Sequence, residues 1–170
     1  MKQIAIFTAM LMMVISCGSG TGDAEEKKVS NDLEIYKKSH NEARPMVEFY
    51  FTITESLVAG DIDLANDAST ELLALMKREE FAEYKEIKAV VSKFREARSI
   101  EDKRLVYVSY TNEIYQLLKN GNLPKGELFL MHCPMAFENK GANWISYRKE
   151  VLNPYFGEKM LNCGAITEEL

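Results

Sequence analysis

Apolar residues recur every three or four positions between about residue 41 and residue 120, with polar residues between them. This spacing places the apolar residues on one face of a helix, and it occurs in four separate stretches. The stripes are Met46, Phe49, Tyr50, Ile53 and Leu57; Leu64, Ala68, Leu72 and Leu75; Tyr84, Ile87, Val91 and Phe94; and Val106, Tyr110, Ile114 and Leu117. The pattern therefore predicts four amphipathic helices.

Residues with known capping preferences separate these stripes. Gly60 ends the first predicted helix, and Asp61 is placed to cap the second. Ser99-Ile100-Glu101-Asp102 has the character of a capping box that opens the fourth helix, and Asn120-Gly121 ends it. Because the links are short, we expect an all-α fold built on an antiparallel up-and-down four-helix bundle. The aromatic residues of the stripes are assigned to its core, with no cofactor between the helices.

The tail, residues 123–170, has a different pattern. Glu127–Met131 is a short apolar run that predicts one strand or extended segment. After it, prolines and glycines are frequent, which predicts turns instead of long elements. We therefore expect a turn-rich C-terminal cap, from about residue 123, packed on the bundle within one domain that spans residues 41–170.

The start of the chain predicts export. A lysine precedes the apolar stretch Ile4–Val14, and Val14-Ile15-Ser16-Cys17 resembles the cleavage box of a lipoprotein. The stretch is too short to span a membrane, which takes about 20 apolar residues. We therefore expect residues 1–16 to be a lipoprotein signal peptide and Cys17 to carry the lipid. Residues 17–40 would be a flexible tether, and the protein would be membrane-anchored in the bacterial envelope, outside the cytoplasm, on the periplasmic side or at the cell surface.

The composition limits the classes of molecule that the protein is expected to bind. The net charge is −5 and no basic cluster follows the leader, which argues against nucleic acid as a partner. Two cysteines remain after Cys17, namely Cys133 and Cys163. Since the compartment outside the inner membrane is oxidising, a disulfide between them is one alternative.

Each of these cysteines lies in a cluster of sulfur-containing residues. The clusters are Met131-His132-Cys133-Pro134-Met135 and Met160-Leu161-Asn162-Cys163-Gly164. Thiolates and thioethers select soft ions, above all Cu(I), with Zn(II) an option at thiolates. We expect the chain to return on itself so that both cysteines meet, with Met135 and Met160 close by as ligands. His132 alternates with Cys133 in an extended run and should face away, so it is only an optional ligand.

The tail also resembles a bacterial domain family of unknown function. Three blocks carry the resemblance: Cys133-Pro134-Met135-Ala136, Lys140-Gly141-Ala142-Asn143-Trp144-Ile145-Ser146, and Asn153-Pro154-Tyr155-Phe156-Gly157-Glu158-Lys159-Met160-Leu161-Asn162-Cys163-Gly164. The helical part matches loosely, chiefly at Ile100–Arg104, where the family tends to have glutamine in place of Lys103. The family occurs as exported lipoproteins and fused to periplasmic adaptor subunits of copper and silver efflux pumps. The resemblance implies a helical domain in metal-handling surroundings, with efflux components as partners.

No pattern typical of an enzyme is present. His132 adjoins Cys133, but nothing in the sequence suggests the third group that would orient a base for a cysteine nucleophile. We therefore expect no catalytic residues. The sequence favours a lipoprotein that binds a soft metal ion. Its candidate ligands are Cys133, Met135, Met160, Cys163 and, as an option, His132. The alternative is a disulfide-stapled helical interaction module, without metal, that docks on an envelope partner.

Overall fold

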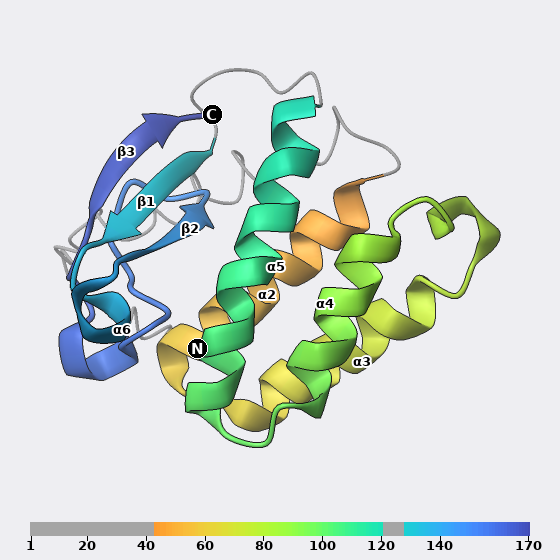
Figure 1. Cartoon of the computed structure of the whole chain (residues 1–170), viewed down its shortest axis with the longest axis horizontal. Helices are drawn as coiled ribbons and strands as arrows, with labels where there is room; N and C mark the ends of the chain where they lie inside the picture. Colours follow the sequence, from red (N-terminus) through yellow and green to blue (C-terminus); the bar gives the residue numbers. More distant parts are fainter. Residues whose placement is uncertain (1–42, 121–127) are drawn as a thin grey trace, which may run out of the picture.

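The structure is a computed structural model that describes residues 43–120 and 128–170. Four long helices form its larger part (Figure 1). They are α2 (Arg44–Ala59), α3 (Ile62–Leu75), α4 (Lys85–Glu96) and α5 (Ile100–Asn120), with a short 3₁₀ helix, η1 (Glu79–Phe81), between α3 and α4. The four helices predicted from the hydrophobic stripes are thus confirmed. The predicted signal peptide and the whole predicted tether, Cys17 included, lie outside the described residues.

The predicted helix boundaries have the expected local chemistry. Gly60 has φ 71°, a left-handed conformation that ends α2 and that glycine adopts without steric cost. The Asp61 carboxylate accepts a hydrogen bond of 2.9 Å from the Leu64 N–H, which caps α3. The Ser99 hydroxyl accepts one of 3.0 Å from the Asp102 N–H at the start of α5.

Helix α3 buries a face shifted from the predicted one. Leu64 is 42% exposed, whereas its neighbour Ala65 is completely buried. The buried stripe runs through Ala65, Ala68, Leu72 and Met76, which fits a period of 3.6 as well as the predicted stripe does. The sequence could not choose between the two because both share Ala68 and Leu72.

The tail is not a turn-rich cap with a single strand. It contains β1 (Phe129–Cys133), β2 (Ala142–Ser146) and β3 (Ala165–Glu169), which form an antiparallel sheet in the order β2-β1-β3. The all-α prediction is therefore wrong: the fold is a helical bundle with an added three-stranded sheet. The tail also has two short helical segments, α6 (Ala136–Asn139) and η2 (Gly157–Met160).

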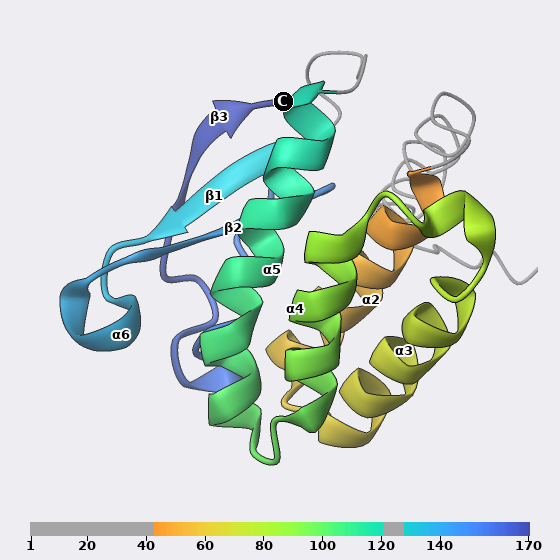
Figure 2. The same ribbon diagram turned by 45° about the vertical axis from the view of Figure 1, so that its right-hand side comes forward.

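Helix α5 lies between the sheet and helices α3 and α4 in both ribbon views (Figures 1 and 2). Alternate residues of β1 are buried, namely Phe129, Met131 and Cys133. Trp144 in β2 pairs with Met131 and is also buried. One face of the sheet therefore completes the hydrophobic core that the helices begin.

A buried hydrogen-bond network joins the sheet to the bundle. The Tyr50 hydroxyl of α2 lies 2.9 Å from the Thr111 hydroxyl and 2.7 Å from the Tyr107 hydroxyl, both on α5. It also accepts a hydrogen bond of 3.0 Å from the Ile145 N–H in β2. Burial raises the pKa of Tyr50 and raises that of Tyr107 further, so both phenols stay protonated at neutral pH.

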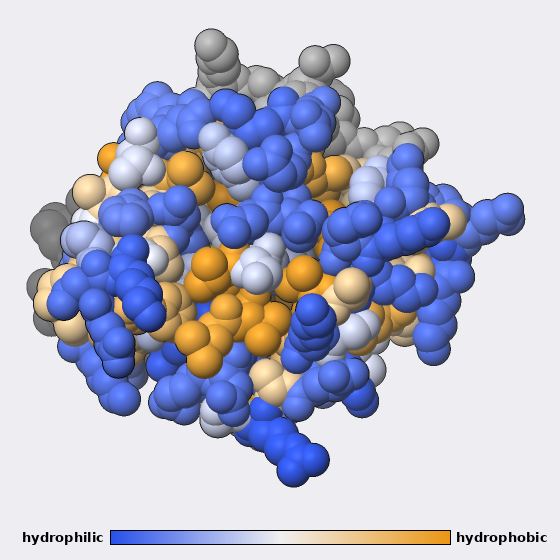
Figure 3. All heavy atoms as spheres, viewed as in Figure 1, coloured by the Kyte–Doolittle hydropathy of each residue, from blue (hydrophilic) through white to orange (hydrophobic). Residues whose placement is uncertain are grey.

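The outer surface contains a concentration of apolar side chains. Figure 3 shows them in the middle of the face seen in Figure 1, over the middle and lower turns of α5. Leu105 of α5 is 57% exposed. In the described parts of the chain, every helix is too short or too polar to cross a membrane.

Candidate functional site

The two tail cysteines meet at one end of the sheet. Cys133 is the last residue of β1 and is buried, and Cys163 is half-buried two residues before β3. Their Sγ atoms lie 3.0 Å apart and both thiols are free. The antiparallel pairing of β1 with β3, which sets His132 opposite Ala165, brings these distant residues together. The predicted return of the chain is confirmed.

The two thiols share a hydrogen bond that changes the acidity of Cys163. The hydrogen bond with Cys133 is the largest cause that raises the pKa of Cys163, and burial adds to it. The Met135 N–H acts in the opposite direction because it donates to the Cys163 sulfur. A metal ion bound here would have to displace protons, so its affinity would increase with pH.

Asn153 holds the segment that carries Cys163. Its side chain is completely buried, and its Nδ2 donates to the Cys163 carbonyl oxygen over 2.6 Å. Its Oδ1 accepts from the N–H of Tyr155 over 2.8 Å, and its own N–H donates to the Leu161 carbonyl oxygen over 2.8 Å. Asn153 therefore ties both ends of this loop. The sequence offered only its place in the third resemblance block as a signal.

A left-handed turn reverses the chain after Cys133. Within α6, Phe137, Glu138 and Asn139 have φ values of 51°, 59° and 66°. Such a conformation costs a non-glycine residue roughly 1–2 kcal/mol, so the turn is strained and must be held by its surroundings. Gly141 follows with φ 77°, and a Cβ there would lie 2.6 Å from the His132 ring. The turn therefore needs glycine at this position.

Arg104 of α5 attaches the tail to the bundle. Its Nε donates to the Pro154 carbonyl oxygen over 2.8 Å, and its Nη2 donates to the Leu57 carbonyl oxygen near the end of α2 over 2.9 Å. Gly157 lies so close that a Cβ there would be 2.8 Å from the Val58 carbonyl oxygen. Helix α2, helix α5 and the tail thus meet at the buried guanidinium of Arg104.

Lys103, the residue that departs from the resembled family, has a separate role. It is completely buried, and its ammonium donates to the Phe94 carbonyl oxygen over 2.8 Å, 4.7 Å from the centre of the Phe94 ring. Burial lowers its pKa. It therefore joins the end of α4 to the start of α5, and these contacts do not involve the cysteines.

The predicted ligands differ in their placement. Met135 is 47% exposed, Met160 in η2 is half-buried, and neither belongs to the buried core. Both contact Cys163 through the backbone: the Cys163 N–H donates to the Met160 carbonyl oxygen over 3.1 Å, and the Met135 N–H donates to the Cys163 sulfur. His132 lies on the opposite face of β1 from Cys133, and its Nδ1 is 2.7 Å from the Asn143 side-chain oxygen.

The donor set at the cysteine pair is narrow. Among the described residues, no group of three or more histidine, cysteine, aspartate or glutamate side chains is placed to hold a metal ion. A structural zinc site ordinarily takes four such ligands. Two thiols at this separation instead suit a soft ion of low coordination number, such as Cu(I).

Comparisons of the chain with protein-family models, curated proteins and solved structures found no match. The resemblance described above therefore rests on the sequence alone, chiefly on its three blocks in the tail.

Proposed function

We propose that this protein is a lipid-anchored envelope protein that binds a soft metal ion, first of all Cu(I), in metal handling or efflux. The observation that carries the proposal is the pair of free thiols of Cys133 and Cys163, whose sulfur atoms lie 3.0 Å apart. The backbones of the exposed Met135 and the half-buried Met160 contact Cys163, and their thioethers are the further ligands of this proposal. The role is one of binding, with no catalysed reaction.

The chemistry of these residues fits a soft ion. Thiolates bind Cu(I) strongly, and thioethers add ligands that stay neutral and do not select hard ions. The Met135 N–H that donates to the Cys163 sulfur favours the thiolate, which is the form that binds metal. The strained turn at Phe137–Asn139 would hold Met135 close to this sulfur.

A competition titration with a Cu(I) chelator tests the proposal. The reduced protein should bind one Cu(I) per chain, and the double variant Met135→Leu/Met160→Leu should bind it more weakly, with its helix content unchanged. Met131→Leu is the matched control, because Met131 is in the same cluster but is completely buried on the core side of β1. Unchanged affinity in the double variant would exclude the thioethers as ligands. Unchanged affinity in Cys133→Ala/Cys163→Ala would exclude the site.

One observation favours a second candidate, the disulfide-stapled interaction module. The two sulfur atoms need to approach by only about 1 Å to reach the length of a disulfide bond. Such a bond would close a loop between residues 30 apart and stabilise the fold by about 3–4 kcal/mol. Thiol counting and elemental analysis of protein purified anaerobically from its own envelope separate the two candidates. A stable disulfide without metal would support this second one.

A further inference from the structure

A cleft of about 480 Å³ lies between α2 and the chain that runs from β2 to η2. This is the size of a pocket for a small organic molecule. Most of its walls are apolar, and these come from both sides: Phe51 and Val58 of α2, Trp144 and Ile145 of β2, and Leu152 and Leu161 of the tail. The cysteine pair is not part of its lining.

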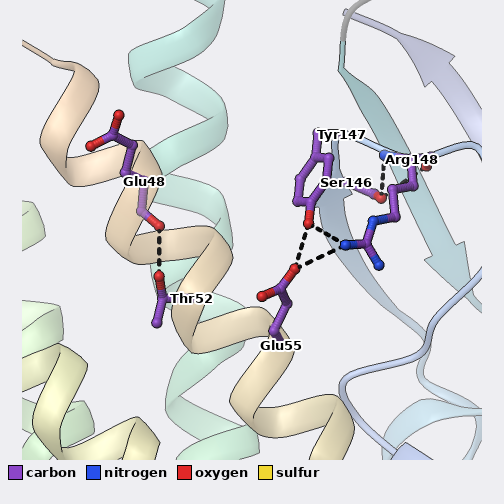
Figure 4. Close-up of polar contacts among 6 residues, drawn as sticks. All are labelled: Glu48, Thr52, Glu55, Ser146, Tyr147 and Arg148. Atoms are coloured by element: carbon purple, nitrogen blue, oxygen red, sulfur yellow. Dashed lines mark hydrogen bonds and ion pairs between the residues drawn. The ribbon is translucent and has the colours of Figure 1, made fainter. Parts of the chain in front are cut away.

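Three polar side chains of the cleft lining, Glu55, Tyr147 and Arg148, contact one another (Figure 4). The Tyr147 hydroxyl donates to the Glu55 carboxylate, and the Arg148 guanidinium donates to the Tyr147 oxygen over 2.6 Å and to Glu55 over 3.4 Å. Burial, with help from Glu55, raises the pKa of Tyr147 to about 12, so the phenol keeps its proton. Arg148 and Glu55 thus largely neutralise one another.

The remaining charge in the cleft is negative. Glu158 of η2 lines it, is exposed, and forms no ion pair with any described residue. Arg148 is the cleft's sole basic lining residue within the described chain, and its charge is balanced by Glu55. An apolar cavity with one uncompensated carboxylate at its rim complements a molecule with an apolar body and a positive group.

We propose that this cleft binds a small amphipathic cation, with an apolar or aromatic body against Phe51 and Trp144 and an amine directed to Glu158. The proposal concerns a different part of the surface from the cysteine pair and holds whether or not the protein binds a metal. Because the walls are apolar and the uncompensated charge is negative, the order of affinities among ligands of the same shape can be predicted. An amine should bind more tightly than an uncharged molecule of the same shape, and a carboxylate more weakly.

The protein contains its own reporter for this test. Trp144 is the single tryptophan of the chain and lines the cleft, so its emission senses an occupant directly. The full chain, anchored on phosphatidylcholine vesicles that contain no tryptophan, is titrated with phenylbutylamine, phenylbutanol or phenylbutyrate. The tryptophan is excited at the red edge of its band to exclude tyrosine. The amine should give a saturable change and bind about three- to fivefold more tightly than the alcohol.

Two variants locate the binding and its charge dependence. Glu158→Gln should reduce the affinity for the amine to about that of the alcohol and leave the alcohol unaffected. Ala59→Phe should abolish the change because Ala59 is exposed and lines the cleft, so a larger side chain there fills it without disturbing the core. Ala89→Phe is the matched control, since Ala89 is exposed on α4 outside the lining.

Three results would overturn the inference. No saturable change with any of the three molecules would mean that the cleft is not a ligand site. Equal or tighter binding of phenylbutyrate would contradict the choice of a cation. An unchanged titration in Ala59→Phe would place the binding elsewhere. None of these results depends on the state of the cysteines, so they neither support nor exclude metal binding at Cys133 and Cys163.

Discussion

Replacement of Arg104 by methionine tests whether one buried guanidinium attaches the tail to the bundle. Arg104 is 7% exposed and donates to two carbonyl oxygens, at Pro154 in the tail and Leu57 in α2. Methionine keeps much of the aliphatic stem but donates no hydrogen bond, so both carbonyls lose their charged partner. The resulting loss should affect the contact between tail and helices more than the helices themselves.

The size of the effect follows from these two hydrogen bonds. A hydrogen bond from a charged group contributes about 1.5–3 kcal/mol, and a buried carbonyl without a partner costs about 1–3 kcal/mol. Removal of a buried charge offsets part of this, because the desolvation that lowers the pKa of Arg104 no longer applies. We therefore expect Arg104→Met to lower the free energy of unfolding by about 2–4 kcal/mol, a large part of the 5–15 kcal/mol typical of a domain.

Urea unfolding followed by circular dichroism measures this loss. Arg98→Met is the matched control, because Arg98 is exposed and its replacement should change stability by less than about 0.5 kcal/mol. Arg104→Lys should fall between the two, since one ammonium cannot reproduce the geometry of the guanidinium fork. A loss in Arg104→Met no larger than that of the control would refute the attachment by Arg104.

Three further predictions concern the thiols, the core network and the anchor. The pH midpoint for alkylation of Cys163 should lie above that of an ordinary cysteine, because only the thiolate reacts and its pKa is raised; Cys133→Ala, which removes the main cause, should lower that midpoint. Tyr50→Phe should destabilise the fold by about 1–3 kcal/mol in urea unfolding, since the Ile145 N–H loses its partner; a neutral result would mean that the network adds no stability. Cys17→Ala should abolish labelling by a fatty-acid probe, and equal label on both proteins would exclude lipidation at this residue.

The helices could be predicted because their signal repeats over long windows. Each of the four stripes contains several apolar positions at a spacing that only a helix places on one face. The error at Leu64 shows the limit of this argument, because two overlapping stripes fit α3 equally well. The choice between them depends on the neighbouring helices and is not encoded locally.

The sheet could not be predicted because its strands are short and its pairing is non-local. Each strand has five residues, and β3 reads Ala-Ile-Thr-Glu-Glu, which is mostly exposed and lacks an apolar alternation. Its conformation is fixed by pairing with β1, more than 30 residues earlier in the chain. Only β1 has an apolar run that could be recognised in isolation.

The site was predicted in part. The meeting of Cys133 and Cys163 followed from the two sulfur-rich clusters, whereas the roles of Asn153 and Arg104 did not. Arg104 contacts carbonyl oxygens 47 and 50 residues away, and backbone acceptors leave no mark in the sequence. The cleft escaped prediction because its lining comes from distant parts of the chain, as Glu55 and Arg148, 93 residues apart, show.

The edges of the two outer strands of the sheet affect the tendency of the protein to aggregate at high concentration. On β2, the outward Ile145 N–H and Asn143 carbonyl are bound by the hydroxyls of Tyr50 and Tyr155. On β3, Glu168 and Glu169 pair with Lys119 and Lys149, so charged side chains accompany the other outer strand. Unprotected strand edges template aggregation between chains, and charge or coverage prevents it. Both edges are thus protected against strand addition by a second copy, and the protection of β2 lies inside the core, where the buried Ile145 N–H has the Tyr50 hydroxyl as its partner.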